Sequence, residues 1–350
     1  MNLIDRRPER SPLQAPASAG GALVDSSARP ISYLRLSITD RCDLRCTYCM
    51  PERMQFLPRE NLLSFDELAR LVDGFIARGV TKLRVTGGEP LVRRGAMDLM
   101  ARFAERLGES GLKELTLTTN GTQLGVHAPA LAALGVRRIN VSLDTLDQDT
   151  YARLTRRDSL KAVLAGIDAA AAAGIHVKIN TVALADANRE EIPRLVAWAH
   201  ARGFDLSLIE VMPLGEDMPG RPESFLSLED VKQDLEAQWS MTPLLDSTGG
   251  PARYVRVNET GGRLGFISPL SHNFCSTCNR IRVTCTGRLY TCLGHDDGAD
   301  LRAALRDDPG PDTFNQVLDA AIGKKPARHA FEADRMDVAA SQRTMSVTGG

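Results

Sequence analysis

Strand-like and helix-like segments alternate along the first two thirds of the chain, and this alternation limits the possible folds more than any other feature. The strand-to-strand repeat is roughly 30 residues, the length of a βαβ unit. Crossover helices of this kind join parallel strands, so the pattern predicts an α/β protein with a mostly parallel sheet. The strand-like runs cover residues 33–39, 82–86, 114–118, 138–142, 176–182 and 206–211.

Residues capable of chemistry follow these runs one after another, each at the C-terminal end of its strand. They include a cysteine loop after residue 39, Gly87-Gly88-Glu89-Pro90, Asn120, Asp144 and Met212. The active site of a (β/α) barrel is built on this rim, whereas a doubly wound sheet concentrates its chemistry at one switch point. We therefore predict a partial (β/α)6 TIM-like barrel, left open because it has fewer than eight units.

The pattern changes after Pro213, where an amphipathic helical stretch (228–239) precedes short, hairpin-like strands near 254–257 and 264–267. We expect a small C-terminal, cysteine-rich α+β extension to the barrel. The predicted organisation is a flexible, poorly packed N-terminal tail (1–29), the barrel (30–215), the C-terminal module (216–335) and a tail ending in Gly-Gly (336–350).

Three thiols lie within eight residues in the loop after the first strand, at Cys42, Cys46 and Cys49. Thiolates spaced this closely on a loop converge on one soft metal site, either zinc or an iron–sulfur cluster. A structural zinc needs four ligands, and no fourth Cys or His lies nearby in the sequence. A 4Fe–4S cluster held by three cysteines keeps one iron open for a ligand. A zinc loop completed by a distant residue is the alternative.

A second cysteine set, Cys275, Cys278 and Cys292, lies in the C-terminal module with the spacing C-x2-C-x13-C. Cys285 could complete a four-thiolate zinc site. The spacing suits a second open iron–sulfur cluster equally well, so both interpretations stand on the residues alone. Cys285 itself lies in a strand-like run, where a lone cysteine is more often a small packed side chain.

Arg280 and Arg282 are two positions apart in the strand-like run beside this set, so their side chains project to the same face. A pair of guanidinium groups next to a metal site suits a phosphate-bearing ligand. Two solvated surface arginines are the ordinary alternative.

Composition argues against several classes of function. The 350-residue chain has a formal net charge of −1, which favours neither nucleic acid nor a membrane surface as a partner. No apolar run approaches the roughly 18–20 residues that span a bilayer, and the N-terminus has no secretion-signal pattern. The seven cysteines are odd in number and grouped as metal ligands are, which predicts a reducing, cytoplasmic setting.

The cysteine loop followed by Gly87-Gly88-Glu89-Pro90 resembles the radical S-adenosylmethionine superfamily over about residues 33–213. Further motifs resemble one family within it, the GTP 3′,8-cyclases, which open molybdenum cofactor biosynthesis. These motifs are Arg35–Cys42 (RLSITDRC), Thr118–Gly121 (TTNG), Asn140–Asp144 (NVSLD), the C-x2-C-N-R-x-R module and the terminal Gly349-Gly350.

The resemblance implies cyclisation of GTP to (8S)-3′,8-cyclo-7,8-dihydroguanosine 5′-triphosphate, with two 4Fe–4S clusters and S-adenosylmethionine. It assigns Cys42, Cys46 and Cys49 to the first cluster and Cys275, Cys278 and Cys292 to the second, against zinc. It assigns Tyr48, Gly88, Ser142 and Met212 to S-adenosylmethionine. It assigns Arg35, Arg84, Thr118, Lys178, Arg280 and Arg282 to GTP, and it places Arg280, Arg282, Gly349 and Gly350 in the active site.

The implied partners are GTP, an electron donor of the flavodoxin or ferredoxin type, and the cyclic pyranopterin monophosphate synthase that receives the product. No nucleic acid or membrane is implied, and monomer and homodimer both remain open. Two other classes stand beside this interpretation: a radical S-adenosylmethionine enzyme acting on a peptide, and a zinc-stabilised nucleic-acid-binding protein.

Overall fold

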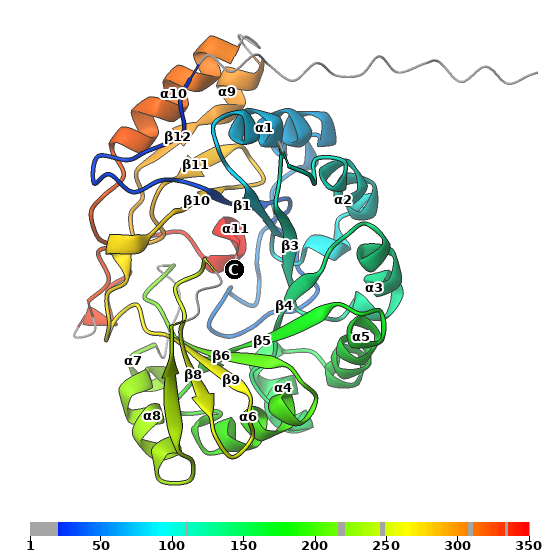
Figure 1. Ribbon diagram of the computed structural model, residues 1–350, viewed down its shortest axis with the longest axis vertical. Coiled ribbons are helices and arrows are strands. Elements are labelled where there is room, and N and C mark those ends of the chain that lie inside the picture. The colour runs from blue at the N-terminus through cyan, green and yellow to red at the C-terminus, as the bar shows by residue number, and fades with distance from the viewer. Residues whose placement is uncertain are drawn as a thin grey trace, which may run out of the picture.

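The fold is taken from a computed structural model, which describes residues 20–109, 111–215, 221–245, 249–306, 311–332 and 335–349. Its centre is one sheet of twelve strands in the order β12-β11-β10-β1-β2-β3-β4-β5-β6-β9-β8-β7. The sheet curves strongly and its edges do not meet, as Figure 1 shows. The α/β class predicted from the alternation is therefore confirmed.

The six N-terminal strands pair in sequence order, each parallel to the next. They are β1 (Tyr33–Ser37), β2 (Lys82–Thr86), β3 (Glu114–Thr119), β4 (Arg138–Ser142), β5 (His176–Ala183) and β6 (Asp205–Glu210). These bounds agree with the strand-like runs of the sequence to within two residues at each end.

The C-terminal strands do not form a sheet of their own but extend the same sheet at both edges. At one edge β10 lies parallel to β1, and at the other β9 lies parallel to β6. The outer strands are antiparallel. The strands are β7 (Met241–Leu244), β8 (Arg253–Val257), β9 (Arg263–Ile267), β10 (Arg280–Val283), β11 (Arg288–Tyr290) and β12 (Gly298–Asp300).

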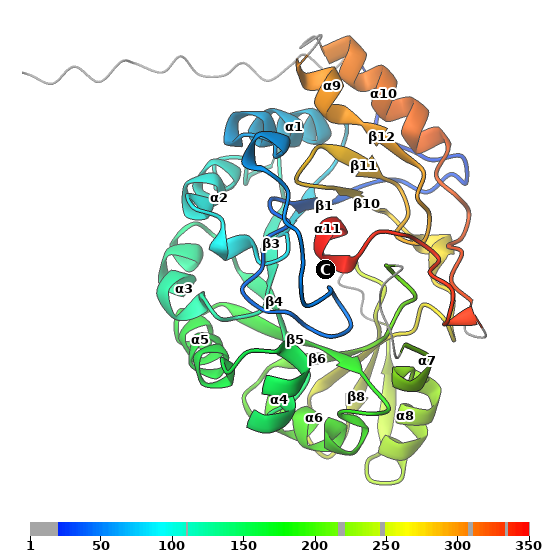
Figure 2. The same cartoon turned by 180° about the vertical axis from the view of Figure 1, so that it is seen from behind.

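Helices cover the outside of the curved sheet, and one short helix lies inside it (Figures 1 and 2). The helices are α1 (Phe65–Ala77), α2 (Ala96–Ala104), α3 (Leu124–Ala133), α4 (Gln148–Thr155), α5 (Leu160–Ala172), α6 (Ile192–Ala201), α7 (Arg221–Ser224), α8 (Leu228–Glu236), α9 (Leu301–Arg306), α10 (Pro311–Gly323) and α11 (Met345–Thr348). The inner helix is α11, close to the described end of the chain. None of the helices that the structure describes is long and apolar enough to cross a membrane.

Side-chain alternation along the strands separates an apolar outer face from a polar inner one. In β1, Leu34 and Leu36 are fully buried in the hydrophobic core, where the covering helices pack. Tyr33 and Arg35, which alternate with these leucines in the sequence, line a cavity on the inner face. Because successive strand residues point to opposite faces, the inner face is available for polar and charged groups.

The described part of the N-terminal segment is packed, unlike the tail that its composition predicted. Leu23 is 1% exposed, and its backbone NH donates to the Arg78 carbonyl at 3.1 Å. Asp25 and Arg29 form a buried ion pair at 2.6 Å. The prediction was wrong for this stretch because it relied on the sparse apolar residues, whereas long-range contacts of Leu23 and Arg29 bury the stretch.

Candidate functional site: two adjoining cavities inside the sheet

The first cysteine loop leaves β1 and forms one wall of a cavity inside the sheet. Cys42, Cys46 and Cys49 all line this cavity, and none is in a disulfide. The loop is fastened to α4 by backbone hydrogen bonds from Arg45 N to the Thr155 carbonyl and from Thr47 N to the Leu154 carbonyl, both 2.9 Å. The three thiols are therefore held on a fixed loop facing one space.

A buried polar network joins this loop to the ends of the next two strands. Glu89 is fully buried and accepts hydrogen bonds from the Thr119 hydroxyl at 2.9 Å and from Asn120 N at 2.6 Å. Burial raises the pKa of Glu89 to about 7. The Asn120 amide donates to Asp43 at 2.7 Å, between Cys42 and Cys46 in the sequence. The network fixes the cysteine loop relative to β2 and β3.

Gly88 allows the chain after β2 to run directly against the cysteine loop. A Cβ at this position would lie 2.4 Å from the Arg41 carbonyl oxygen, so only glycine fits. The Gly88 backbone lines the first cavity as a result. Tyr48, Ser142, Met212 and Thr118 line the same cavity. Thr118, which the resemblance assigns to GTP, thus lies in the wall near the first cysteine set.

The chemistry of the thiols fits a positively charged iron cluster. Burial raises the pKa of Cys42 and of Cys49 to about 12, so neither thiol ionises without a cationic partner. Metal coordination deprotonates a thiol outright. Within the described ranges, no group of three His, Cys, Asp or Glu side chains is arranged to hold a metal ion. A four-iron cluster separates its thiolates more widely than a single ion does, so this finding does not argue against a cluster.

The second cysteine set lines an adjoining cavity. Cys275 lies in a single 3-10 turn and Cys278 ends it, just before β10, while Cys292 follows β11. All three line the cavity, whereas Cys285 is fully buried outside both cavities. The fourth-ligand role that the sequence left open for Cys285 is therefore wrong, and its alternative role as a packed side chain agrees with the structure.

Five cations from four strands line the second cavity, and no carboxylate among the described residues shares the lining with them. Burial, and then the charge of neighbouring Arg282, hold the pKa of Arg35 well below its usual range. Burial, and then Arg84, lower the pKa of Lys178 to about 7. The set is Arg35, Arg84, Lys178, Arg280 and Arg282. Such a cluster of like charges is stabilised by a polyanion.

Unsatisfied polar atoms also point to a missing ligand in this cavity. The Nε atoms of Arg35 and Arg84 are buried without a hydrogen-bond partner, as are the Oδ1 atoms of Asn140 and Asn180. Buried polar groups in native proteins are nearly always paired. A ligand rich in oxygen and nitrogen would satisfy them, so the residues present fit a nucleotide with its phosphates.

The two cavities share part of their walls, and the C-terminal segment reaches this shared region. Asn180, Met212 and Met345 line both cavities, and Met345 belongs to α11. The carbonyl of Gly349, the next residue after α11, accepts a hydrogen bond from Arg282 Nη1 at 2.6 Å. Gly350 lies outside the described residues.

Several lining residues were missed by the sequence reasoning. Asn180 is two positions after Lys178 in β5, and Asn140 is two positions before Ser142 in β4. The period-2 rule applied to each predicted strand could have found both. Met345 had no comparable signal, because its place depends on where the C-terminal segment turns into the sheet.

Curated relatives match this chain over nearly its whole length. The GTP 3′,8-cyclase of Erythrobacter litoralis (strain HTCC2594) is 58% identical over 332 residues, covering 95% of this chain and 100% of the relative. The GTP 3′,8-cyclase of Caulobacter vibrioides is 54% identical over 350 residues, covering 100% of both chains. The Radical SAM superfamily model matches residues 36–199, and the Molybdenum Cofactor Synthesis C model matches residues 204–331.

The chain belongs to the GTP 3′,8-cyclase family.

Members of the GTP 3′,8-cyclase family are enzymes. The N-terminal part of this chain matches the Radical SAM superfamily model, and the C-terminal part matches the Molybdenum Cofactor Synthesis C model. Solved structures agree on the fold. Streptococcus suis SuiB bound to S-adenosylmethionine has a TM-score of 0.59 at 15% identity, covering 84% of this chain and 68% of that one. SuiB bound to the precursor peptide SuiA has a TM-score of 0.58 at 15% identity, covering 85% and 65%. These likenesses concern the fold alone.

Proposed function

We propose that this protein cyclises GTP to (8S)-3′,8-cyclo-7,8-dihydroguanosine 5′-triphosphate, the first step of molybdenum cofactor biosynthesis. One observation carries the proposal: a three-thiol cavity shares a wall with a cavity lined by five cations and three further thiols. Family membership at 54–58% identity supports the same reaction. No observation favours a peptide or a nucleic acid as the substrate.

The first cavity would hold one 4Fe–4S cluster on Cys42, Cys46 and Cys49, together with S-adenosylmethionine. When bound, this pair supplies the radical that removes the 3′ hydrogen of GTP. Tyr48, Gly88, Ser142 and Met212 line the space beside the thiols, so they would orient S-adenosylmethionine. Tyr48 donates a hydrogen bond of 2.5 Å to Asp144, which fixes its ring.

The second cavity would hold GTP, with its base toward a second 4Fe–4S cluster on Cys275, Cys278 and Cys292. One arginine side chain can donate two parallel hydrogen bonds to phosphate oxygens. The triphosphate would therefore be bound by Lys178 and the four arginines of this cavity: Arg35, Arg84, Arg280 and Arg282. Alignment matters because the C3′–H bond must face the first cavity and the base must remain within reach of C3′. The shared wall at Asn180 and Met212 suits this arrangement.

The C-terminal segment would exclude water from the reacting atoms. It lies inside the sheet, and Gly349 contacts both Arg282 and Thr86. We also propose a division of the chain into three parts. Residues 30–215 form the open radical S-adenosylmethionine barrel, residues 216–335 form the extension that binds the second cluster and GTP, and residues 336–350 form a tail. An electron donor of the flavodoxin or ferredoxin type and transfer of the product to the cyclic pyranopterin monophosphate synthase stay predictions.

The decisive experiment follows the abstracted hydrogen. Anaerobic, reconstituted protein is mixed with S-adenosylmethionine, a strong reductant and GTP deuterated at C3′, and the 5′-deoxyadenosine is analysed by mass spectrometry. We expect deuterium in the 5′-deoxyadenosine and the cyclised triphosphate as product. Cleavage of S-adenosylmethionine without deuterium transfer would reject GTP as the substrate in the proposed orientation.

Cysteine variants separate the two sites. Serine at Cys278 should leave S-adenosylmethionine cleavage measurable but remove productive GTP binding, because the second cluster loses a ligand. Cys285→Ala is the matched control, since this thiol is buried outside both cavities. Normal GTP cyclisation by Cys278→Ser would reject the assigned role of the second set.

A further inference from the structure

Lys325 follows α10 and is buried beside the second cysteine set. Lys325 is 3% exposed. The ammonium donates to the Arg280 carbonyl at 3.0 Å and to the Thr291 carbonyl at 2.5 Å, and it lies 3.6 Å from Cys278 Sγ. It thus connects the strand that follows Cys278 to the residue that precedes Cys292.

The charge of Lys325 has no carboxylate partner within the described part of the chain, where its acceptors are two carbonyls and one thiol. Burying an ammonium without a counter-charge is costly. The thiolates of a bound cluster would supply the missing negative charge.

The segment that continues from Lys325 also contacts the cysteine set. His329 N donates to Cys275 Sγ at 3.4 Å. Hydrogen bonds to the sulfur ligands of an iron–sulfur cluster raise its reduction potential, and outer-shell partners orient the ligands. Residues 325–329 therefore supply a donor to each of two cluster ligands, Cys275 and Cys278.

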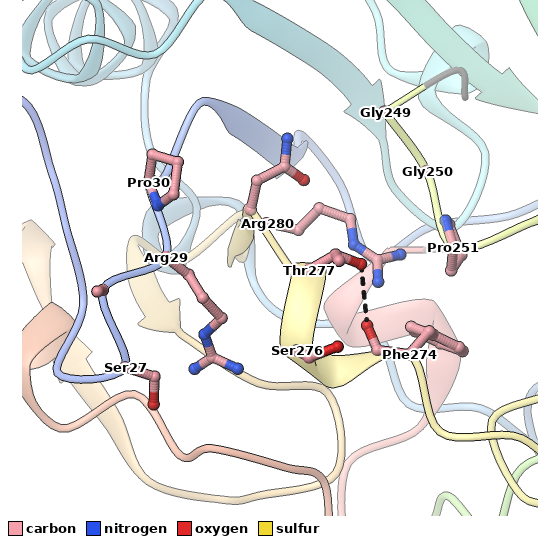
Figure 3. A pocket seen from close by; sticks show the side chains of 12 residues that line it. Ser27, Arg29, Pro30, Gly249, Gly250, Pro251, Phe274, Ser276, Thr277 and Arg280 are labelled. Carbon is pink, nitrogen blue, oxygen red and sulfur yellow. Dashed lines mark hydrogen bonds between the residues drawn. The ribbon is translucent and has the colours of Figure 1, made fainter. Parts of the chain in front are cut away.

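Arg29, from the other end of the chain, fixes this segment in place. Its guanidinium donates to the carbonyls of Pro326 at 2.7 Å, Ala327 at 3.0 Å and Cys275 at 2.8 Å, while Asp25 binds its Nε. In Figure 3 the Arg29 side chain extends alongside the turn that carries Ser276 and Thr277. One buried guanidinium thus ties together the N-terminal segment, the cysteine turn and residues 326–327.

We propose that Lys325 is a positioning and charge-compensating residue of the second cluster, and that Arg29 holds it in register with the cysteine turn. The inference rests on the proposed function in one respect, that Cys275, Cys278 and Cys292 hold a cluster. Removing the ammonium should destabilise the reduced cluster, which carries one more negative charge. The midpoint potential of the second cluster should therefore fall.

The test uses the full chain with Cys42, Cys46 and Cys49 replaced by serine, so that only the second cluster contributes. Lys325→Met removes the charge at similar volume, Lys325→Arg keeps the charge, and Lys324→Met is the matched control on the exposed neighbour. Iron and sulfide per chain and the midpoint potential, from anaerobic redox titration followed by electron paramagnetic resonance, are measured for each. Lys325→Gln, which keeps polar N–H groups, replaces the Met variant where that variant does not fold by circular dichroism.

We expect a lower midpoint potential and partial iron loss for Lys325→Met, and values near those of the parent for Lys325→Arg and Lys324→Met. Arg29→Lys, which cannot reach three carbonyls at once, should lose iron while keeping the net charge. A cluster whose potential and iron content are the same in Lys325→Met and Lys324→Met overturns the inference and leaves the proposed function intact. A parent protein that binds no iron overturns both.

Discussion

The cationic side chains that line the second cavity lie on the inner faces of strands, where every second residue points. Arg35 and Arg282 are partners across β1 and β10, and Arg35 and Arg84 across β1 and β2, so three guanidinium groups lie side by side. Burial, and then Arg280, lower the pKa of Arg282 to about 10. These like charges repel one another, and a bound anion would relieve the repulsion.

Gly349 is the residue at which a single methyl group should have the largest effect. Its φ is +76°, and a Cβ would lie 1.8 Å from the Thr86 hydroxyl oxygen. Gly349→Ala should therefore displace the C-terminal segment and break the hydrogen bond from Arg282 to the carbonyl of residue 349. We expect GTP cyclisation to fall at least tenfold, or about 1.4 kcal/mol, measured as turnover of reconstituted enzyme.

Iron content is measured alongside turnover, because Ser346 of the same segment donates a backbone hydrogen bond to Cys49, and a loss of iron would mean that the first cysteine set is disturbed as well. Gly323→Ala is the control, since a Cβ there meets nothing within 4 Å. Equal turnover in both variants would show that the close approach to Thr86 is not needed for the reaction.

Some of these residues could be predicted from the sequence and others could not. Cys42, Cys46 and Cys49 lie within eight residues, so the prediction that they face one site does not depend on a correct prediction of the fold. Strand alternation also predicts that Arg280 and Arg282 project to the same face of their strand. The place of Cys285 and of Met345 depends on contacts between segments far apart in the chain, which no local pattern records.

At the scale of elements, the six βα units were predictable because each strand and helix is specified by its own periodicity. Helix α1 illustrates this: Ser64 and Glu67 form a capping box, with Ser64 N donating to Glu67 at 2.7 Å. The addition of β9 and β10 to the same sheet was not predictable, since pairing partners leave no trace in either strand's own sequence. The expected C-terminal extension instead contributes its strands to one continuous twelve-stranded sheet.

The N-terminal segment gives a prediction at the same scale. Leu23 is 1% exposed and packs in the main core, whereas its neighbour Val24 is 53% exposed. Leu23→Ala should lower the free energy of unfolding by about 2–4 kcal/mol, and Val24→Ala by less than about 1 kcal/mol. Denaturant unfolding of the two variants measures both values. Similar losses in both would mean that the segment does not pack as the structure has it.

At the scale of the whole molecule, a nearly neutral chain encloses a strongly cationic cavity. The formal net charge is −1, so the five inward-facing cations are balanced by acids elsewhere, outside the cavity lining. This separation of charge favours a polyanion in the interior and gives the outer surface no general affinity for one. Composition alone could not reveal it.

Ligand-induced stabilisation tests this charge separation. Inorganic tripolyphosphate at about 100 times its Kd should stabilise the folded protein by about 2.7 kcal/mol, a rise in Tm of about 3–5 °C. GTP should act likewise, and guanosine without phosphates much less. Arg84→Met should reduce the rise, because its guanidinium lines the cavity. A rise that is the same for guanosine and tripolyphosphate would contradict an anion-binding interior.

The pairing of β1 with β10 has a consequence for how the protein is made. Ser32 and Asn279 are hydrogen-bonded neighbours beside these strands but are 247 residues apart in the chain. At a ribosomal rate of about 5–20 residues per second, β1 emerges roughly 12–50 s before its outer partner. During that interval its outer edge is open to pairing with other chains. Newly made protein therefore stays exposed to misassembly at this edge until β10, which lies between Cys278 and Cys292 in the chain, has left the ribosome.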